Sequence, residues 1–224
     1  MMKNTIVVLG VALLMAGVVL AIAGSTFTFN SETRWAGVAS GQDTTEGGNI
    51  TNGDLGSATL TEKWAAYWGN VSGSIRLWDG TNSVYVWSVG NDSVVGEVCA
   101  STNSAFAFST ATSGSGADVD TAWSFTAADT DSATNTLTGA GCALTFTGIS
   151  TISGSDSVLH TDSNYETCVI DDGATGAETN FAFCGVLNNT GVSFDGTPSQ
   201  YELMVPTTDT AGADETFFFY LELN

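Results

Sequence analysis

The stretch Ser74-Ile75-Arg76-Leu77-Trp78 is followed by Asp79-Gly80-Thr81-Asn82 and then by Ser83-Val84-Tyr85-Val86-Trp87. Alternating side chains flank four residues that favour a tight turn, and this pattern predicts a β-hairpin. In the predicted hairpin, Ile75 and Leu77 share one face. The stretch therefore indicates a fold built from strands.

Short strand-like stretches continue along the chain. Candidates lie at residues 94–100, 104–108, 122–125, 142–146, 165–170, 180–187, 201–205 and 216–223. Many short strands at this spacing are typical of sandwiches and barrels. We therefore expect an all-β protein, a β-sandwich of the jelly-roll or immunoglobulin-like kind. We expect residues 59–224 to form it as one domain, with no long helix after residue 70 and with loops at 109–121 and 126–141.

One short helix is expected near residues 60–68. Thr59-Leu60-Thr61-Glu62 has the form of a capping box, which satisfies free amide groups at the start of a helix. Trp64 and Trp68 follow at i and i+4, a spacing that places them on one helix face. We expect these tryptophans to join the core at one end of the sandwich.

The N-terminus predicts export from the cell. Lys3 precedes an uncharged apolar run at residues 5–23, which ends in Ala21-Ile22-Ala23. This is the pattern of a secretory signal peptide at residues 1–23. The alternative is an uncleaved anchor, since the run is about long enough to span a bilayer. Membrane contact is expected only in the second case, through uncleaved residues 5–23. The protein is expected at the cell surface or outside the cell.

The cysteines fit an oxidising compartment. Cys99, Cys142, Cys168 and Cys184 are even in number, which predicts two disulfides with three possible pairings. The chain has no C-x-x-C spacing and only one histidine, so a zinc site of cysteine and histidine is not expected.

The charge balance narrows the choice of partners. The chain has 24 acidic and 4 basic residues, a formal net charge of −20. Such a surface repels nucleic acid, which excludes DNA-binding and RNA-binding functions. The acidity fits solubility at high salt or the binding of divalent cations. Aromatic residues make up 10% of the chain, so a folded core is expected rather than disorder.

Part of the sequence resembles a known group of proteins. The run WAAYWGNVSGSIRLW at residues 64–78 and the stretch 84–87 resemble a module of uncharacterised secreted archaeal proteins. The stretches YELMVP at 201–206 and ETFFFYLEL at 215–223 are similar to their C-terminal hairpin. This resemblance implies a cell-surface β-protein and carries no catalytic residues. In architecture the chain is also similar to archaeal extracellular thread subunits, whose features would imply glycans and strands donated between neighbours.

Four asparagines lie in N-x-S/T sequons and are candidates for glycosylation: Asn49, Asn70, Asn91 and Asn188. Among the acidic pairs, we select Asp129 and Asp131 as candidate ligands for a calcium ion, because calcium prefers hard oxygen ligands on loops. The alternative is a pair of solvated loop carboxylates. Calcium is the only cofactor that the sequence suggests.

No catalytic constellation stands out, and we expect no enzyme. His160 has serine and aspartate nearby but lacks a marked nucleophile turn such as G-x-S-x-G, so a surface or strand-end histidine is expected. A glycosidase would need two carboxylates at a set separation in a cleft, which spacing along the chain does not define.

Exposed aromatic residues are the last feature. The alternation in the hairpin predicts that Trp78, Tyr85 and Trp87 form a patch opposite the core face. Such a patch serves carbohydrate stacking or a protein interface. The alternative is a hairpin buried on both faces.

The N-terminal arm at residues 24–58 carries Phe27 and Phe29, which would lie on one face of a strand. We expect this strand to complete the sheet of a neighbouring subunit. The leading hypothesis is a structural subunit of an extracellular filament or surface layer that assembles with itself by strand exchange. The alternative is a monomeric cell-surface adhesin or carbohydrate-binding module.

Overall fold

The computed structural model describes residues 27–32, 34, 60–89, 95–139, 141–146, 151–173, 176–208 and 214–223. The predicted signal at residues 1–23, most of the arm, and the sequons at Asn49 and Asn91 lie outside the described residues. Within the described part, no helix is long and apolar enough to cross a membrane.

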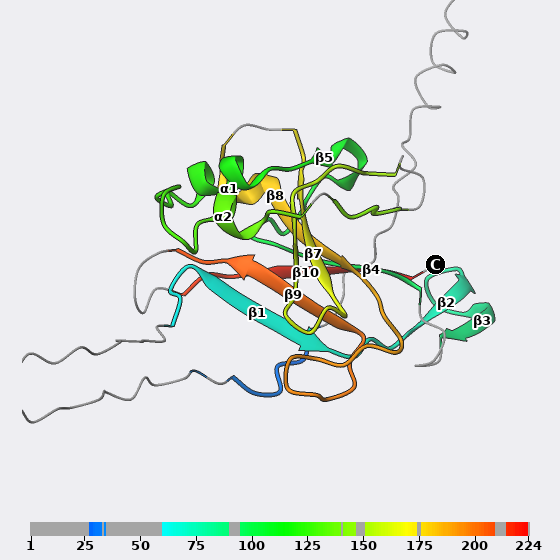
Figure 1. Ribbon diagram of the computed structural model, residues 1–224. Helices are drawn as coiled ribbons and strands as arrows, with labels where there is room; N and C mark the ends of the chain where they lie inside the picture. Colours follow the sequence, from blue (N-terminus) through cyan, green and yellow to red (C-terminus); the bar gives the residue numbers. More distant parts are fainter. Residues whose placement is uncertain are drawn as a thin grey trace, which may run out of the picture.

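The larger sheet is antiparallel and has six strands. Their order is β10 (Phe218–Leu223), β4 (Gly96–Ser101), β8 (Phe181–Val186), β7 (Glu166–Asp171) and β5 (Thr112–Ser113), with β6 (Ser157–Leu159) also paired to β7. A second antiparallel sheet joins β1 (Trp64–Gly69) to β9 (Tyr201–Pro206), and it packs across the larger sheet through β9 (Figure 1). The expected all-β class is confirmed.

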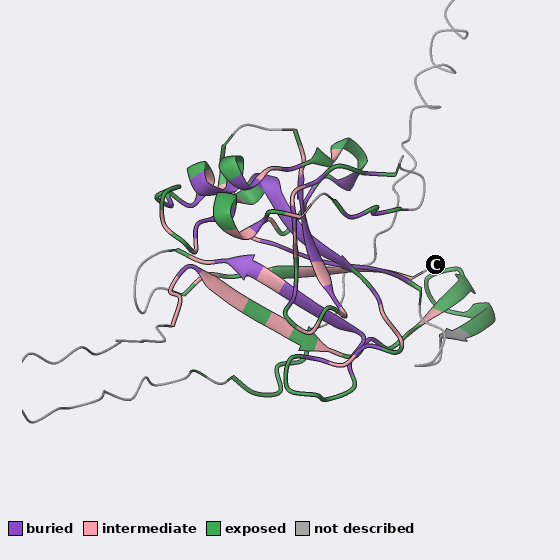
Figure 2. Ribbon diagram, viewed as in Figure 1, coloured by how far each residue is buried: buried purple, intermediate pink, exposed green. Residues whose placement is uncertain are grey.

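Side chains of the larger sheet alternate between two cores. Val98, Phe183 and Val169 point toward β9 and join one hydrophobic cluster. Their neighbours Cys99, Cys184 and Cys168 point the other way into a second cluster with Phe106, Phe108, Leu144 and Phe146. Because both faces are covered, β4, β7 and β8 are buried almost throughout (Figure 2).

Two short helices complete the first cluster. Helix α1 (Gly116–Ala122) and helix α2 (Ala133–Thr136) contact one another and bury Val119 and Ala133. The Asp120 carboxylate accepts hydrogen bonds from the backbone of Ala133 at 2.6 Å and of Thr134 at 3.1 Å. Helices α1 and α2 lie in the regions predicted as loops. There, Ser115 accepts a hydrogen bond from the Asp118 amide as N-cap of α1, and Ser132 does the same for Asn135 in α2.

The predicted helix near residues 60–68 is wrong, because residues 64–69 form strand β1. Each residue of β1 pairs with β9, from Trp64 opposite Pro206 to Gly69 opposite Tyr201. A two-turn helix is marginal in water, whereas the sheet satisfies backbone groups along the whole strand. Trp64 is half-buried, but Trp68 is 38% exposed and does not join the core.

Three predicted strands are also absent where they were expected. The stretch 104–108 is a turn that leads into the 3-10 helix η1 (Phe108–Thr110), and 122–125 is the end of α1 with a turn. The stretch 142–146 makes only an isolated bridge between Leu144 and Ile152. Their apolar residues pack against the larger sheet without extending it. A second 3-10 helix, η2 (Glu178–Asn180), precedes β8.

Candidate interaction surfaces

The two sheets are joined by a hydrogen bond on one side, whereas the end strand of each sheet lies on the other side. On one side, the Met204 amide of β9 donates a hydrogen bond to Thr167 Oγ1 of β7 at 3.0 Å, which joins the sheets. On the other side lie β1 and β10, the end strands of their sheets. Within the described residues, β1 pairs only with β9 and β10 only with β4. Each of these strands therefore has a described strand along only one of its edges.

Aromatic side chains of β1 and β10 contact one another on this second side, which we call the open side of the sandwich. The ring of Tyr67 on β1 lies 4.9 Å from that of Phe219 on β10 and 6.2 Å from that of Phe217. All three side chains are half-buried, although they pack against the first core cluster. Burial and the carboxylates of Glu32 and Glu215 raise the pKa of the Tyr67 phenol. The open side of the sandwich is thus apolar and only partly covered.

Phe27 lies on this open side. Its ring stacks on Phe219 at 4.4 Å between centroids and meets Tyr67 edge-on at 5.7 Å. Residues 27–30 form no strand, and Phe27 remains 43% exposed and Phe29 64% exposed. The described part of the arm thus contacts its own domain through the Phe27 ring and through an ion pair between Arg34 and Glu62. Burial of both phenylalanines in a neighbour stays a prediction.

The predicted hairpin is confirmed as β2 (Gly73–Trp78) and β3 (Ser83–Val89). Ile75 and Leu77 share one face as predicted, but the predicted grouping of Tyr85 and Trp87 with Trp78 is wrong. Ile75 pairs with Trp87 and Leu77 with Tyr85, so these four side chains share one face. Trp78, next to Leu77, lies with Arg76 on the other face, away from Tyr85 and Trp87.

Both faces of the hairpin are exposed (Figure 2). On one face Leu77 is 55%, Tyr85 58% and Trp87 49% exposed. On the other, Trp78 is 53% exposed, and the Arg76 guanidinium lies 5.9 Å from its ring centroid. Neither the predicted core face nor the alternative of burial on both faces is observed. Ile75 and Leu77 stay at the surface because the hairpin projects beyond the two sheets (Figure 1).

The carboxylates of Asp129 and Asp131 hold a lysine. Lys63 Nζ lies 3.1 Å from Asp129 Oδ2 and 2.8 Å from Asp131 Oδ1, and the lysine side chain is only 8% exposed. Hydrogen bonds from Lys63 and Thr61 lower the pKa of the Asp131 carboxyl group. An ammonium group thus lies where the calcium ion was predicted. In the described part of the chain, no group of three or more His, Cys, Asp or Glu residues is arranged to hold a metal ion.

His160 follows β6 directly, so of the two expected placements the strand end is observed, whereas the surface is not, because the side chain is buried. Its Nδ1 lies 2.8 Å from Glu202 Oε1 and its Nε2 lies 2.9 Å from Thr167 Oγ1. The order hydroxyl, imidazole, carboxylate is that of a catalytic triad. However, Thr167 is fully buried, and its hydroxyl oxygen also accepts a hydrogen bond from the Met204 amide. The Thr167 hydroxyl is therefore not accessible to a substrate. The network instead connects β7 to β9.

The four cysteines are paired as Cys99–Cys184 and Cys142–Cys168. Cys99, Cys184 and Cys168 are directly opposite one another on the adjacent strands β4, β8 and β7. Three of the cysteines therefore form one row across the sheet. The sequence alone left three pairings possible, because the spacing of cysteines along the chain does not show which residues lie opposite one another in the sheet.

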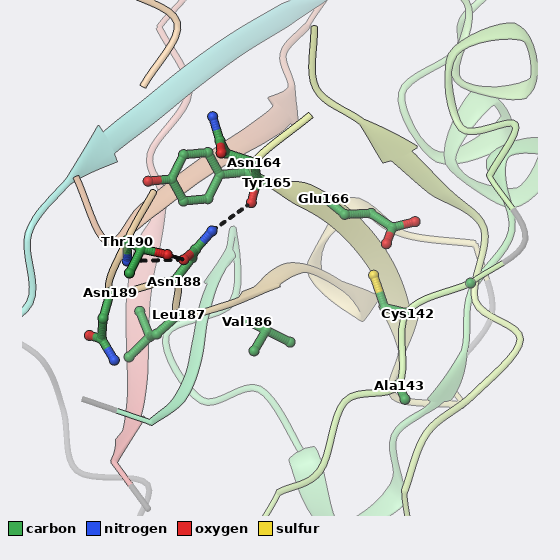
Figure 3. Close-up of a pocket in the computed structure, with 11 residues that line it drawn as sticks. Cys142, Ala143, Asn164, Tyr165, Glu166, Val186, Leu187, Asn188, Asn189 and Thr190 are labelled. Carbon is green, nitrogen blue, oxygen red and sulfur yellow. Dashed lines mark hydrogen bonds between the residues drawn. The ribbon is translucent and has the colours of Figure 1, made fainter. Parts of the chain in front are cut away.

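A cavity of about 710 Å³ lies beside Cys142, the fourth cysteine (Figure 3). Its lining includes Cys142, Val186, Asn164 and the sequon residue Asn188. Asn188 Nδ2 donates to the Asn164 carbonyl oxygen at 3.2 Å, and its Oδ1 accepts from the Thr190 amide at 3.1 Å. Asn70, the other described sequon, is exposed after β1. Asn70 is thus the more accessible acceptor.

No family model matches the chain, and neither the curated proteins nor the solved structures contain a significant match. The candidate surfaces therefore rest on geometry. Sequence reasoning missed the open side between β1 and β10, because Tyr67 was assigned to a helix. The aromatic run at 217–220 was its one signal in the sequence.

Proposed function

We propose that the protein is a structural subunit of an extracellular filament or surface layer, and that its subunits assemble by strand exchange. The observation that carries the proposal is the stacking of Phe27 on Phe219, beside β1 and β10, the end strands of their described sheets. A segment from a second copy would fit the same place with the same side chains. There it could extend one of the two end strands by β-augmentation.

Several features support an exchange between copies. In the described part of the arm, Phe27 stays 43% exposed and Phe29 64% exposed, so both rings can still be buried by a neighbour. A strand that paired with β10 would bury more of both rings than the present contact does. A contact from the arm of one copy to the open side of the next is heterologous, and repetition of such a contact produces a fibre rather than a closed dimer.

Location at the cell surface belongs to the same proposal. The apolar run at residues 5–23 favours export, and two disulfides fit an oxidising compartment. Exposed Asn70 supports N-glycosylation there.

The test compares the full exported chain with the double variant Phe27→Ser/Phe29→Ser. We expect the parent to form polymers in negative-stain images and sedimentation, and the variant to remain a folded monomer. Both side chains are substantially exposed, so the variant should lose less than about 2 kcal/mol of stability. The matched control is Leu159→Ser, which removes a 59% exposed apolar side chain of β6, at the opposite end of the larger sheet from β10.

Two results would contradict strand exchange. Unfolding of the domain after deletion of residues 24–35 would show that the arm belongs to its own sheet. A parent chain that stays monomeric at high concentration would favour the monomeric adhesin or carbohydrate-binding module instead.

A further inference from the structure

The hairpin β2–β3 carries the largest group of exposed apolar side chains in the described part of the chain. Ile75, Leu77, Trp78, Val84, Tyr85, Val86 and Trp87 are each between 39% and 80% exposed. Contiguous apolar surface of this kind marks an interaction site. We propose that the hairpin binds a second copy of this chain. The inference rests on the proposed function, to which it adds a second contact between subunits.

The charge distribution favours a second copy as the partner. Residues 73–89 contain one basic residue, Arg76, and one acidic residue, Asp79, whereas the chain as a whole has a net charge of −20. Two copies repel one another wherever their acidic surfaces face. The neutral hairpin is a surface through which they can approach at low electrostatic cost. The same net charge disfavours nucleic acid and anionic lipid as partners.

The backbone favours a protein partner over a lipid one. Strands β2 and β3 form a two-stranded sheet, and neither pairs with a further strand within the described residues. In a bilayer the free backbone groups on both outer edges would find no hydrogen-bond partner, which costs several kcal/mol per group. The edge of another hairpin would satisfy them by extending the ladder. Pairing of two hairpins would also bring their apolar faces into one continuous sheet.

The hairpin also lies near the open side of the sandwich. A Cβ atom at Gly73 would lie only 2.6 Å from Leu223 Cδ1, so the base of β2 packs closely against the end of β10. Figure 1 shows the hairpin projecting from this end of the molecule. A copy held at the open side is therefore close to the hairpin, and the two contacts can act on the same neighbour.

The test separates the hairpin contact from strand exchange. In the Phe27→Ser/Phe29→Ser chain, strand exchange is removed, and we expect the hairpin alone to form dimers at high concentration. Adding Leu77→Thr, Tyr85→Thr and Trp87→Thr should raise the dissociation constant at least about tenfold, because buried aromatic side chains dominate protein interfaces. Threonine keeps strand propensity. The matched control is Leu159→Thr, which removes a 59% exposed apolar side chain of β6.

A second variant tests the hairpin without removing its apolar residues. Arg76→Glu makes the hairpin acidic, so it should weaken the dimer by repulsion between copies, more strongly at low salt than at high salt. The self-association proposal is overturned if neither hairpin variant changes the dissociation constant. It is also overturned if the parent floats with neutral phosphatidylcholine vesicles and the threonine variant does not. If the parent polymerises only through Phe27 and Phe29, strand exchange stands and the hairpin contact fails.

Discussion

Lys63 determines what the carboxylates of Asp129 and Asp131 bind. The lysine side chain is 8% exposed, whereas Asp129 and Asp131 are 45% and 40% exposed. Both carboxylates raise the pKa of the Lys63 ammonium group well above its usual value. Asp129 and Asp131, which were predicted as calcium ligands, thus neutralise the ammonium group of Lys63. Spacing in the sequence gave no sign of this, because Lys63 precedes Asp129 by 66 residues.

Asp131→Asn should therefore lower the stability of the domain near neutral pH. The variant leaves the nearly buried ammonium with a weaker partner, and the half-exposed carboxylate limits the loss to about 1–2 kcal/mol. The folded-state pKa of Asp131 is lowered, so its contribution is full above the unfolded pKa of about 3.9 and disappears as the pH falls through the lower folded pKa. Denaturant unfolding from pH 7 to pH 2 measures the difference.

The parent and the variant should converge at the acid end of that range. The control is Asp214→Asn, which changes an exposed carboxylate. A stability gap between parent and Asp131→Asn that stays constant down to pH 2 would contradict the role of the carboxylate.

The row of cysteines leads to a second prediction at this scale. Cys142 is 8% exposed and lines the cavity, whereas Cys99, Cys168 and Cys184 are at most 1% exposed. Graded treatment with a small thiol should therefore reduce Cys142–Cys168 first. The Cys168 thiolate is then directly opposite Cys184, and by attacking Cys184 Sγ it would form a new Cys168–Cys184 bond and release the Cys99 thiolate.

Alkylation followed by non-reducing peptide mapping would detect these species. We expect no free thiol in the untreated protein and loss of about 2–5 kcal/mol of stability when one bridge is removed. Two or more free cysteines before treatment would contradict the disulfide prediction. Early release of Cys99 and Cys184 together would contradict the order of reduction.

At the scale of elements, the hairpin and strands β4, β7, β8, β9 and β10 could be predicted because their signals are local. Each is a short run rich in β-branched, aromatic or apolar residues between turn residues. Strand β1 could not, since its capping-box sequence and tryptophan spacing are equally local and favour a helix. Its partner β9 lies more than 130 residues away, and sheet pairing of this kind overrides local propensity.

The candidate surfaces also divide into features with a local sequence signal, which could be predicted, and features set by distant strand pairing, which could not. Phe27 and Phe29 were recognised from their spacing, and so was the aromatic content of the hairpin. The sorting of Trp78, Tyr85 and Trp87 failed because it depends on the pairing register of the hairpin. Leu77 pairs with Tyr85, and a register that differed by one residue would have placed Tyr85 on the other face. The open side between β1 and β10 depends on the order of strands in two sheets, which the sequence pattern does not contain.

At the scale of the whole molecule, assembly must overcome repulsion between subunits that each have a formal net charge of −20. Both proposed contacts are largely apolar: Phe27 with Tyr67 and Phe219, and the faces of the hairpin. Salt reduces the repulsion, since the distance over which charges act falls from about 30 Å at 0.01 M to about 3 Å at 1 M. Apolar contacts do not weaken under the same change.

We therefore expect sodium chloride to promote assembly. The concentration at which the exported chain begins to polymerise should fall by about tenfold or more between 0.05 M and 1 M salt, as measured by light scattering and sedimentation. Calcium chloride at matched ionic strength should have the same effect if it acts only by screening. A larger effect of calcium, reversed by a chelator, would instead indicate a calcium site at the subunit contact. Dissociation of the polymers by sodium chloride would contradict apolar assembly, because only contacts made of ion pairs weaken as charges are screened.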